Sequence, residues 1–571
     1  MEISNQRLAK TLRNVAAALT IKKIGNIFQI RAYENAADSI EHSTSEAKDL
    51  WEEGKLGNLP ALGASIQGYL EEFFKTGRVK HFEEVEKGMP RIVFELLDIS
   101  GIGPKTAQKL ADLGVKNLDD LKKQLKSGEL IKKGFSGKLG QNILSGLEQM
   151  QNKAVKRMLL PYAYEQAERI LEYLRKSKDV IQVFPLGSLR RMVVTVGDLD
   201  FAVSSDNPKA VVNYFCKMPQ IFRILDQGET KATVILQSGI QVDLLVGMTN
   251  SFGALLQHFT GSKSHNIHLR TLALQKALSL SETTKTKTEE EFYGLLKMDV
   301  PPAEIREDTG EIETALKHSL PNLVELKDIK GDLHLHSNFS IVSPSHGPGV
   351  NSIEEIVRKA QQLGYEYVGI SDHPLGFSTS SLEDKIRWAK KRTKFIQSLN
   401  KSTESVRVLN GLEIDILGDG SLSVPDKALE TLDYCIAGIH SGHRGSKDEI
   451  TKRLISALNS PYVDIISHPT NRLLNKRDSS DADWEEIFKL VAKNNKILEI
   501  NAYPNRLDLR DDLVRQALKF SVKFIINTDA HEISQMDNMK FGVSVARRGW
   551  AEAKDIVNTW SWTDFAKWFN I

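Results

Sequence analysis

Histidine and carboxylate side chains recur at the ends of short apolar segments from residue 331 onward. In "GDLHLH", residues 331–336, His334 and His336 are two residues apart, so on a strand they would point to the same face. Other apolar segments of this region end in the same kinds of residue: His373, Glu413, His440, His468, and Asp529 with His531. A single histidine at a strand end is usually structural, but this recurrence in one region indicates a shared metal site.

These side chains can act together only if the fold brings them to one place. Apolar segments alternate with helical patterns from residue 331 to the end of the sequence, which is typical of a parallel sheet or barrel. In βα barrels the carboxyl ends of the strands meet at one rim, so we expect convergence there. Mixed histidine and carboxylate ligands suit zinc, manganese or iron. Several such ions together activate water for attack on a phosphate ester.

A second set of carboxylates lies in the middle of the chain, in "PLGSLRRMVVTVGDLDFAV" and "IQVDLLV". Asp198 and Asp200 alternate on a predicted strand, and Asp243 lies on a predicted hairpin that turns at Ser238-Gly239. Carboxylates on one face repel each other unless divalent cations lie between them. Three on adjacent strands would bind two Mg²⁺ ions for phosphoryl transfer, whereas an isolated Asp-x-Asp pair could be a solvated strand edge.

Helical patterns fill the N-terminal part of the chain, to about residue 155. In "LLDISGIGPKTAQKL", residues 96–110, Gly101 and Gly103 lie between two of them, and Lys105 begins the second. The N–H groups of such a turn bind a DNA backbone phosphate, as in a helix-hairpin-helix motif; an ordinary interhelical turn is the alternative. "NLPALGASIQGYLEEF", residues 58–73, is a weaker copy that contains Gly63, because Ala61 replaces its first glycine.

Length and composition exclude several classes of protein. With 571 residues the chain is too long for one hydrophobic core, so several domains are expected. Its two cysteines, Cys216 and Cys435, exclude a disulfide framework and fit a reducing cytoplasm. No apolar run approaches the length of a membrane span, and the polar N-terminus does not predict a signal peptide. The net charge of +2 confines any basic surface to a local patch.

"GSLRR" followed by "GDLD" resembles the nucleotidyltransferase signature of family X DNA polymerases, and "HFTGSKSHNIHLR", residues 258–270, resembles their nucleotide-binding segment. By this resemblance Asp198, Asp200 and Asp243 are the catalytic, Mg²⁺-binding carboxylates. The resemblance also implies a nucleotide-binding set: Gly187, Ser188, Arg191 and Gly197 for the triphosphate, Phe259 and Gly261 for the sugar, and Asn266 and Arg270 for the minor-groove side of the nascent pair. His258 replaces a tyrosine of the animal members, which leaves ribose discrimination open.

Residues 331–571 resemble the PHP (polymerase and histidinol phosphatase) domain, a distorted seven-stranded βα barrel with a trinuclear metal site; "HPTNRLL", "LEINAYPNRLDL" and "ARRGW" belong to this likeness. The resemblance implies three groups of ligands: His334, His336, Glu413 and Asp529; Glu413, His440 and His468; and His373 with His531. Ile341 stands where the family usually has a metal-binding Asp or His, so we expect two well-occupied metals and a labile third. His346, in a lengthened loop, is the alternative ligand.

Family X members with lyase activity use a lysine after the first hairpin to form a Schiff base with an abasic sugar. Aligned on "LPALG", this position is Tyr69, and a phenol cannot form the imine. The resemblance therefore implies binding of DNA ends by this segment, without that lyase activity.

Together the resemblances cover nearly the whole chain, in the domain order of bacterial family X DNA polymerases with a C-terminal PHP domain. They predict a multidomain fold: a lyase-like helical DNA-binding domain at 1–90, fingers with a helix-hairpin-helix motif at 91–155, an α+β nucleotidyltransferase palm at 156–245, a thumb at 246–320 and the PHP barrel at 331–571. The predicted function is the filling of short gaps in DNA repair, including base excision repair, with a metal-dependent 3′-5′ exonuclease in the PHP domain. Abasic-site endonuclease and 3′-phosphatase activities are further candidates.

Two alternatives stay open on the sequence. An inactive palm would leave a DNA-end-processing nuclease. Slight support for this alternative comes from the uncharged Val193 and Val194, because they lie in a loop that is often charged in the relatives. A structural PHP domain would instead leave a polymerase that binds DNA. The expected cofactors are two Mg²⁺ ions in the palm and two to three Mn²⁺ or Zn²⁺ ions in the PHP domain. The expected partners are gapped or primer-template DNA and dNTPs, and we expect a cytoplasmic monomer that does not bind membranes.

Overall fold

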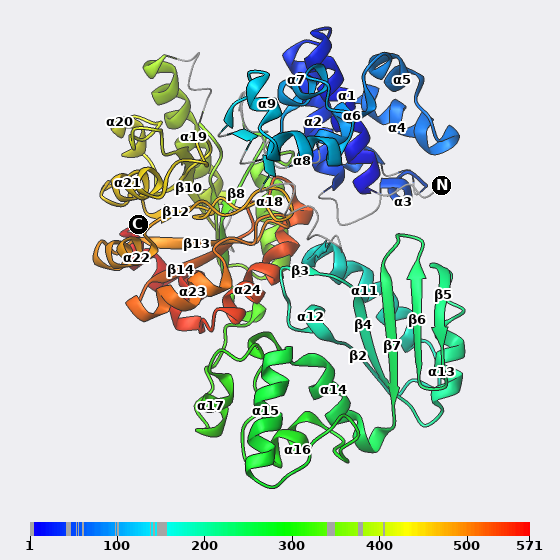
Figure 1. The fold of residues 1–571 in the computed structure, drawn as a ribbon. Coiled ribbons are helices and arrows are strands. Elements are labelled where there is room, and N and C mark those ends of the chain that lie inside the picture. Colours follow the sequence, from blue (N-terminus) through cyan, green and yellow to red (C-terminus); the bar gives the residue numbers. More distant parts are fainter. Residues whose placement is uncertain are drawn as a thin grey trace. The chain divides into compact units, whose positions relative to one another are not determined.

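The computed structural model describes residues 5–41, 47–52, 54, 56–59, 62–97, 99, 102–137, 139–140, 143–144, 157–339, 349–374, 381–402 and 406–571. The chain separates into two compact units, residues 1–158 with 237–239, and residues 159–236 with 240–571 (Figure 1). The predicted fold class, helical domains followed by an α+β domain and a βα barrel, is confirmed.

Helices make up the first unit, and each buries an apolar stripe. The described ones are α1 (Asn5–Lys22), α2 (Ile27–Glu41), α3 (Ala47–Glu52), η1 (Leu56–Asn58), α4 (Ala64–Thr76), α5 (Lys80–Glu86), α6 (Arg91–Leu96), α7 (Pro104–Asp112), α8 (Leu118–Lys126) and α9 (Glu129–Lys132). Leu12 and Leu19 of α1 share a core cluster with Ile66 and Leu70 of α4. A separate cluster around Leu110 joins α6, α7 and α8, so the two predicted hairpin regions have separate cores.

The second unit begins with an α+β region, in which β2-β4-β7-β6-β5 form a five-stranded mixed sheet and β1-β3 form a separate two-stranded sheet. Its elements are β1 (Met158–Leu159), α11 (Leu160–Arg175), β2 (Gln182–Pro185), α12 (Gly187–Arg190), β3 (Thr195–Val196), β4 (Leu199–Ser204), α13 (Pro208–Phe215), β5 (Ile221–Gln227), β6 (Lys231–Leu236), β7 (Gln241–Gly247) and η2 (Thr249–Ser251). β4 and β7 run parallel, whereas β6 pairs antiparallel with β7. The predicted hairpin turn at Ser238-Gly239 is confirmed.

A helical segment follows this sheet within the second unit. It contains α14 (Phe252–Thr260), α15 (Lys263–Gln275), α16 (Glu289–Gly294), η3 (Ala303–Ile305) and α17 (Glu311–Leu316). Leu269, Phe292 and Tyr293 belong to its apolar core. Buried polar side chains lie beside that core, among them Glu289 and Arg306, which pair with each other. This segment therefore combines apolar packing with internal ion pairs.

The C-terminal part is built on seven parallel strands in the order β14-β13-β12-β11-β10-β9-β8. The strands are β8 (Gly331–Leu335), β9 (Tyr367–Ile370), β10 (Arg407–Asp415), β11 (Tyr434–Gly438), β12 (Ile465–Ile466), β13 (Ile497–Asn501) and β14 (Lys523–Asn527). A parallel bridge between Leu335 and Ala530 joins the two ends of this sheet. The predicted distorted seven-stranded barrel is thus confirmed.

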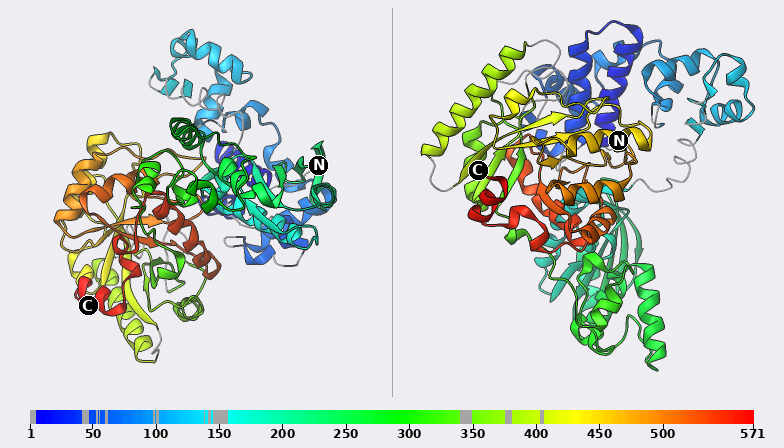
Figure 2. Two further views of the ribbon diagram at one scale, coloured as in Figure 1. Left: turned by 90° about the horizontal axis from the view of Figure 1, so that it is seen from below. Right: turned by 90° about the vertical axis from the view of Figure 1, so that its left-hand side faces the viewer.

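Helices lie outside these strands, as the green to red ribbons in Figure 2 show. They are η4 (Leu326–Asp328), α18 (Ile353–Leu363), α19 (Leu382–Ser402), α20 (Asp426–Leu429), α21 (Lys447–Leu458), α22 (Trp484–Lys493), α23 (Asp511–Ala517), η5 (Leu518–Phe520), η6 (Ile533–Asn538), α24 (Met539–Arg548), η7 (Ala553–Asp555), η8 (Val557–Thr559) and α25 (Trp562–Phe569). α18 begins at the Ser352–Glu355 capping box and ends at Gly364. A search of the described helices finds none with the length and hydropathy that a membrane span requires.

The inside of the barrel is filled by side chains, among them the ring of Tyr434. One apolar cluster takes at least one residue from every strand of the barrel, Tyr434 included. A Cβ atom on Gly369 would lie 2.1 Å from the Tyr434 hydroxyl, and one on Gly411 would lie 2.2 Å from Cζ of the same ring. Glycine at both positions therefore makes room for the ring, which gives the strands a rigid support for their carboxyl ends.

Candidate active sites

The three middle-chain aspartates meet on the parallel strand pair of the first sheet. Asp200 in β4 lies directly opposite Asp243 in β7, and Asp198 immediately precedes β4. One carboxylate oxygen from each residue lies within 4.8 Å of the others. Parallel pairing thus brings together carboxylates that are far apart in the sequence.

Repulsion within this trio favours a bound cation. Burial, together with the charges of Asp198 and Asp243, raises the pKa of Asp200 to about 7. Asp243 is oriented by two donors, the hydroxyl of Thr233 and the Nε2 of Gln241, which is 2.7 Å from Oδ2. A divalent cation among the carboxylates would offset their repulsion, and a ligand set made of oxygen atoms suits Mg²⁺. The residues present therefore fit the expected metal.

Residues 187–197, which we call the triphosphate loop after the ligand that the sequence resemblance predicts for them, approach the aspartates closely. Gly187 begins α12 with a φ of +55°, and a Cβ atom there would lie 2.7 Å from Oδ2 of Asp200. Only glycine combines this backbone conformation with such a close approach. Ser188 is half-buried in the turn of α12, and Gly197 directly precedes Asp198. The loop can thus present backbone N–H groups beside the carboxylates.

Hydrogen bonds hold the two arginines of this loop. Nε of Arg191 donates to Oε1 of Glu307 at 2.9 Å, and a terminal nitrogen of Arg191 donates to the backbone oxygen of Thr260 at 2.8 Å. A terminal nitrogen of Arg190 donates to Oε2 of Glu289 at 2.6 Å. Both side chains therefore tie the loop to the helical segment that follows the sheet.

The predicted nucleotide-binding segment forms the end of α14, the start of α15 and the turn between them. Asn266 is fixed by its Nδ2, which donates to the backbone oxygen of His258 at 2.7 Å. A terminal nitrogen of Arg270 lies 3.1 Å from Nδ1 of the same histidine. A Cβ atom on Gly261 would lie 2.8 Å from Oδ1 of Asn266, and Phe259 is exposed. His258 thus contacts two predicted nucleotide-binding residues.

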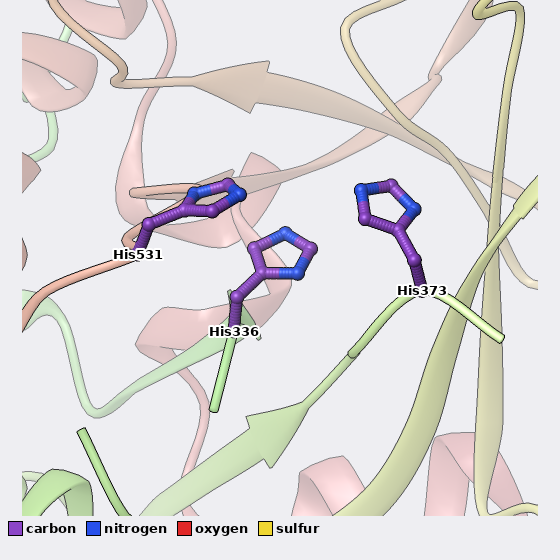
Figure 3. Close-up of side chains that lie close together, drawn as sticks. All are labelled: His336, His373 and His531. Carbon is purple, nitrogen blue, oxygen red and sulfur yellow. The ribbon is translucent and has the colours of Figure 1, made fainter. Parts of the chain in front are cut away.

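The histidines and carboxylates of the barrel converge at the carboxyl ends of the strands. They form three overlapping groups whose ligand atoms lie within 4.8 Å of one another: His334, His336, Glu413 and Asp529; Glu413, His440 and His468; and His336, His373 and His531. The first two groups contain the residues that the resemblance implies. The third adds His336 to the implied pair, and Figure 3 shows its three rings together. The rings of His336 and His531 stack with 4.1 Å between their centroids.

Glu413 lies at the centre of this cluster. Its Oε2 is 3.2 Å from Nε2 of His334 and 3.1 Å from Nε2 of His373. Its Oε1 is 3.0 Å from Nε2 of His440 and 2.9 Å from Nε2 of His468. Although burial raises the pKa of Glu413, the charges of His334, His373 and His440 hold it well below its usual range. A carboxylate whose two oxygens face different imidazole groups is suited to bridge two metal ions.

Buried nitrogen atoms test whether the cluster fits metal ions. Nε2 of His334 and Nε2 of His336 are buried, and each lies 3.2 Å from a carboxylate oxygen, of Glu413 and of Asp529 respectively. Burial and the adjacent His531 lower the pKa of His336 to about 4, so its imidazole is neutral. A neutral imidazole is the form that binds metals, and imidazole nitrogens beside carboxylate oxygens are a ligand set that suits a divalent cation. The cluster therefore fits divalent metal ions.

Glu499 is a buried part of this site that the sequence reasoning missed. It lies in β13, and its Oε1 is 2.7 Å from Nδ1 of His334. Its Oε2 accepts a hydrogen bond from the backbone N–H of His468 at 2.7 Å, and the amides of Asn501 and Asn527 donate to its two oxygens. The carboxylate thereby orients His334 so that Nε2 faces the cluster. The sequence feature that could have indicated Glu499 is a glutamate inside the apolar run "ILEIN".

Arg506 also lies beside the cluster without having been predicted. Its Nε is 3.6 Å from Oδ2 of Asp529, and one terminal nitrogen is buried without a hydrogen-bond partner among the described residues. Burial and then the charge of Arg477 lower the pKa of the neighbouring His443 to about 4. Cationic groups thus gather at this edge of the site, where a phosphate oxygen could accept the unused hydrogen bond.

The predicted DNA-binding turns lie in the first unit. Gly63 and Gly103 are the N-cap residues of α4 and α7, and Lys105 is exposed in the first turn of α7. No described atom outside the immediate backbone lies within 4 Å of a Cβ atom built on either glycine, so both turns are open on that side. Gly101, Ile341 and His346 lie outside the described residues.

Family models match four segments of the chain. They are a helix-hairpin-helix domain at residues 3–79, the fingers domain of DNA polymerase lambda at 95–133, the DNA polymerase beta thumb at 255–307 and the PHP domain at 332–503. Their order is the one expected from the sequence motifs.

Full-length similarity points to the same family. The DNA polymerase/3′-5′ exonuclease PolX of Bacillus subtilis (strain 168) is 35% identical over 573 residues, which cover 98% of this chain and 98% of that protein. Proteins named probable phosphatases, from Thermoanaerobacter sp. (strain X514) and Clostridium acetobutylicum, are 26% and 28% identical over 40% and 35% of this chain, and over 89% and 78% of their own lengths. The chain therefore belongs to the bacterial family X DNA polymerases that carry a C-terminal PHP domain.

Proposed function

We propose that this chain fills short gaps in DNA during repair, including base excision repair, and removes nucleotides from 3′ ends with its PHP domain. Members of its family are DNA polymerases with a 3′-5′ exonuclease, and this chain has a candidate site for each activity. The observation that carries the proposal is the presence of two separate metal-ligand clusters, one with three aspartates and one centred on Glu413. The domain division proposed is 1–90, 91–155, 156–245, 246–320 and 331–571.

In the polymerase site Asp198, Asp200 and Asp243 are proposed to hold two Mg²⁺ ions, which would supply charge stabilisation for phosphoryl transfer. Thr233 and Gln241 keep Asp243 in place. The nucleotide contacts proposed from the resemblance are Gly187, Ser188, Arg191 and Gly197 for the triphosphate, Phe259 and Gly261 for the sugar, and Asn266 and Arg270 for the minor groove. The contact between Arg270 and His258 supports a role for His258 beside the nascent pair.

In the PHP domain the three histidine and carboxylate groups are proposed to hold two to three Mn²⁺ or Zn²⁺ ions, which would activate water for attack on a phosphodiester. Glu413 would bridge two of the ligand groups, and Glu499 would orient His334. Arg506 would bind a non-bridging oxygen of the scissile phosphate with its unused terminal nitrogen. Abasic-site endonuclease and 3′-phosphatase chemistry would use the same groups.

The DNA contacts proposed for the first unit are the turns at Gly63, Gly101 and Gly103, with Lys105 as a phosphate ligand. Gapped or primer-template DNA and dNTPs are the proposed substrates. We also propose that the protein acts as a cytoplasmic monomer.

One assay tests the proposal as a whole. The purified protein is incubated with 5′-labelled gapped DNA, with and without dNTPs, in Mg²⁺ and in Mn²⁺. Primer extension with dNTPs and stepwise shortening from the 3′ end without them are the expected results. Shortening without any extension would instead make the protein a DNA-end-processing nuclease. Extension without any shortening would leave the PHP domain with a structural role.

A further inference from the structure

The motif "ARRGW" belongs to the PHP domain by sequence, yet its arginines lie away from the ligand groups described above. Arg547 and Arg548 occupy the last turn of α24. Arg547 forms an ion pair with Glu304, 2.7 Å from Nε to Oε1, and donates a hydrogen bond to the backbone oxygen of Val324. This ion pair joins α24 of the barrel to η3, which lies in the segment matched by the thumb model.

Arg548 makes a more extensive set of contacts, and its side chain is only 10% exposed. Its Nε is 2.7 Å from Oδ2 of Asp511, which fixes the guanidinium from the barrel side. Its terminal nitrogen NH1 donates to three oxygens: the backbone oxygen of Arg191 at 2.9 Å, the backbone oxygen of Glu304 at 3.2 Å and Oε1 of Glu307 at 3.0 Å. A PHP-domain residue therefore contacts the triphosphate loop directly.

Oε1 of Glu307 is shared between two guanidinium groups. It accepts from NH1 of Arg548 at 3.0 Å and from Nε of Arg191 at 2.9 Å. Arg548 thus acts on Arg191 in two ways. It fixes the backbone of the loop, and it shares the carboxylate of Glu307, which holds the Arg191 side chain. Without Arg548, the charge of Glu307 would act on Arg191 alone and hold that side chain more strongly.

We propose that Arg548 is a positioning residue for the polymerase reaction: the PHP domain uses it to orient Arg191 for the triphosphate of the incoming nucleotide. This inference rests on the proposed role of Arg191. Arg548 does not touch the nucleotide; it sets the position of the loop and moderates the ion pair between Glu307 and Arg191. Oε1 of Glu307, which both arginines contact, thereby couples the two domains.

The test is the steady-state kinetics of single-nucleotide gap filling by the full chain. Arg548→Met should raise the KM for the dNTP by about tenfold, as expected for loss of a charge-assisted hydrogen bond, with a much smaller change in kcat. Exonuclease activity should be unchanged, which also shows that the barrel is folded. Arg547→Met is the matched control, because it removes the adjacent arginine of the same helix without touching Arg191 or Glu307. A KM at the wild-type value in Arg548→Met, or an equal rise in Arg547→Met, would overturn the proposal.

Two further variants separate this inference from its premise. Arg191→Met should raise the KM for the dNTP by itself; no effect there would reject the role of Arg191 and the inference with it. A rise in Arg191→Met with none in Arg548→Met would reject only the inference. The double variant Arg548→Met/Glu307→Gln should recover part of the lost nucleotide affinity, because the carboxylate charge that restrains Arg191 is gone, and a merely structural role for Arg548 predicts no recovery. If Arg548→Met is insoluble, Arg548→Lys keeps one charge near Glu307 and should give an intermediate KM.

Discussion

At the scale of single residues, the barrel site depends on carboxylates that serve several imidazoles at once. Glu413 faces five histidines through its two oxygens, so its position is determined by the whole cluster. Glu499 lies on the far side of His334 from the cluster, and each of its oxygens accepts two hydrogen bonds. Oε1 accepts from Nδ1 of His334 and Nδ2 of Asn527, and Oε2 accepts from the backbone N–H of His468 and Nδ2 of Asn501. All four partners act as donors when His334 carries its proton on Nδ1, which leaves Nε2 as the metal-binding nitrogen.

Glu499→Gln should therefore weaken metal binding, because the amide nitrogen of the glutamine would direct its N–H groups at one of the two pairs of groups that donate to Glu499. We expect the affinity for Mn²⁺ to fall by roughly 10- to 100-fold, the usual effect of losing such a partner. Titration calorimetry on the metal-free protein measures this directly. Glu485→Gln, which changes an exposed glutamate of α22, is the control. Equal affinities in the two variants would show that Glu499 does not orient His334.

At the scale of elements, a buried ion network holds α12 against the helices that follow the sheet. Glu289, at the start of α16, pairs with Arg190 from the triphosphate loop and with Arg306. Although burial raises the pKa of Glu289, Arg306 and then Arg190 hold it at about 2. The folded-state pKa is thus lowered, so the network stabilises the fold above the ordinary glutamate pKa. That stabilisation is lost as the pH falls from about 4.5 towards about 2.

Replacing Glu289 with Gln should destabilise the protein by about 3 kcal/mol at neutral pH, because the buried Arg306 loses its counter-charge. Denaturant unfolding followed by circular dichroism gives this difference. The loss should shrink as the pH is lowered through the range in which wild-type Glu289 becomes protonated. Glu290→Gln, at the exposed neighbouring position, should stay within about 0.5 kcal/mol of wild type. A similar loss in both variants would mean that the network contributes no special stability.

α4 carries the other prediction at this scale. The ring of Tyr69 stacks on His81 with 4.8 Å between centroids and packs against the core of the first unit, so it has a structural role. Borohydride should not trap the protein on 5′-deoxyribose-phosphate DNA, because a phenol forms no imine. A trapped adduct that disappears when a lysine is replaced would show that another residue performs the lyase reaction. A lyase-active family member run in parallel verifies the DNA substrate.

At the scale of the whole molecule, the chain joins two phosphate chemistries that use different ligands. The three-aspartate cluster presents oxygen atoms alone, whereas the barrel cluster is mainly imidazole. This difference favours Mg²⁺ in the first and Mn²⁺ or Zn²⁺ in the second.

The two activities should separate by mutation. Asp200→Ala should reduce primer extension by more than about 100-fold, because a ligand shared by both expected Mg²⁺ ions is lost, and leave 3′ shortening intact. Glu413→Gln should reduce 3′ shortening and leave primer extension intact. Each variant is therefore the folding control for the other. Gel analysis of labelled gapped DNA measures both activities in one reaction. Loss of both in Asp200→Ala would argue against independent sites.

The sequence by itself determined the family and most of the candidate ligands. "GSLRR", "GDLD" and "DLHLH" are short motifs in which chemistry depends on neighbours one or two residues apart, so local spacing is enough to find them. The Ser352 capping box and the Ser238-Gly239 turn were predictable for the same reason, because caps and hairpin turns use local hydrogen bonds.

Only the tertiary structure decided which side chains act together across long stretches of chain. The register that sets Asp200 opposite Asp243 follows from parallel pairing of β4 and β7, which no local pattern specifies. In the sequence, Glu499 resembles any other glutamate in a strand. Closure of the barrel places it beside Nδ1 of His334, 165 residues away in the sequence. Arg548 reaches Glu307, 241 residues away in the sequence, for the same reason: burial and long-range packing select the partners of charged side chains, and sequence distance does not.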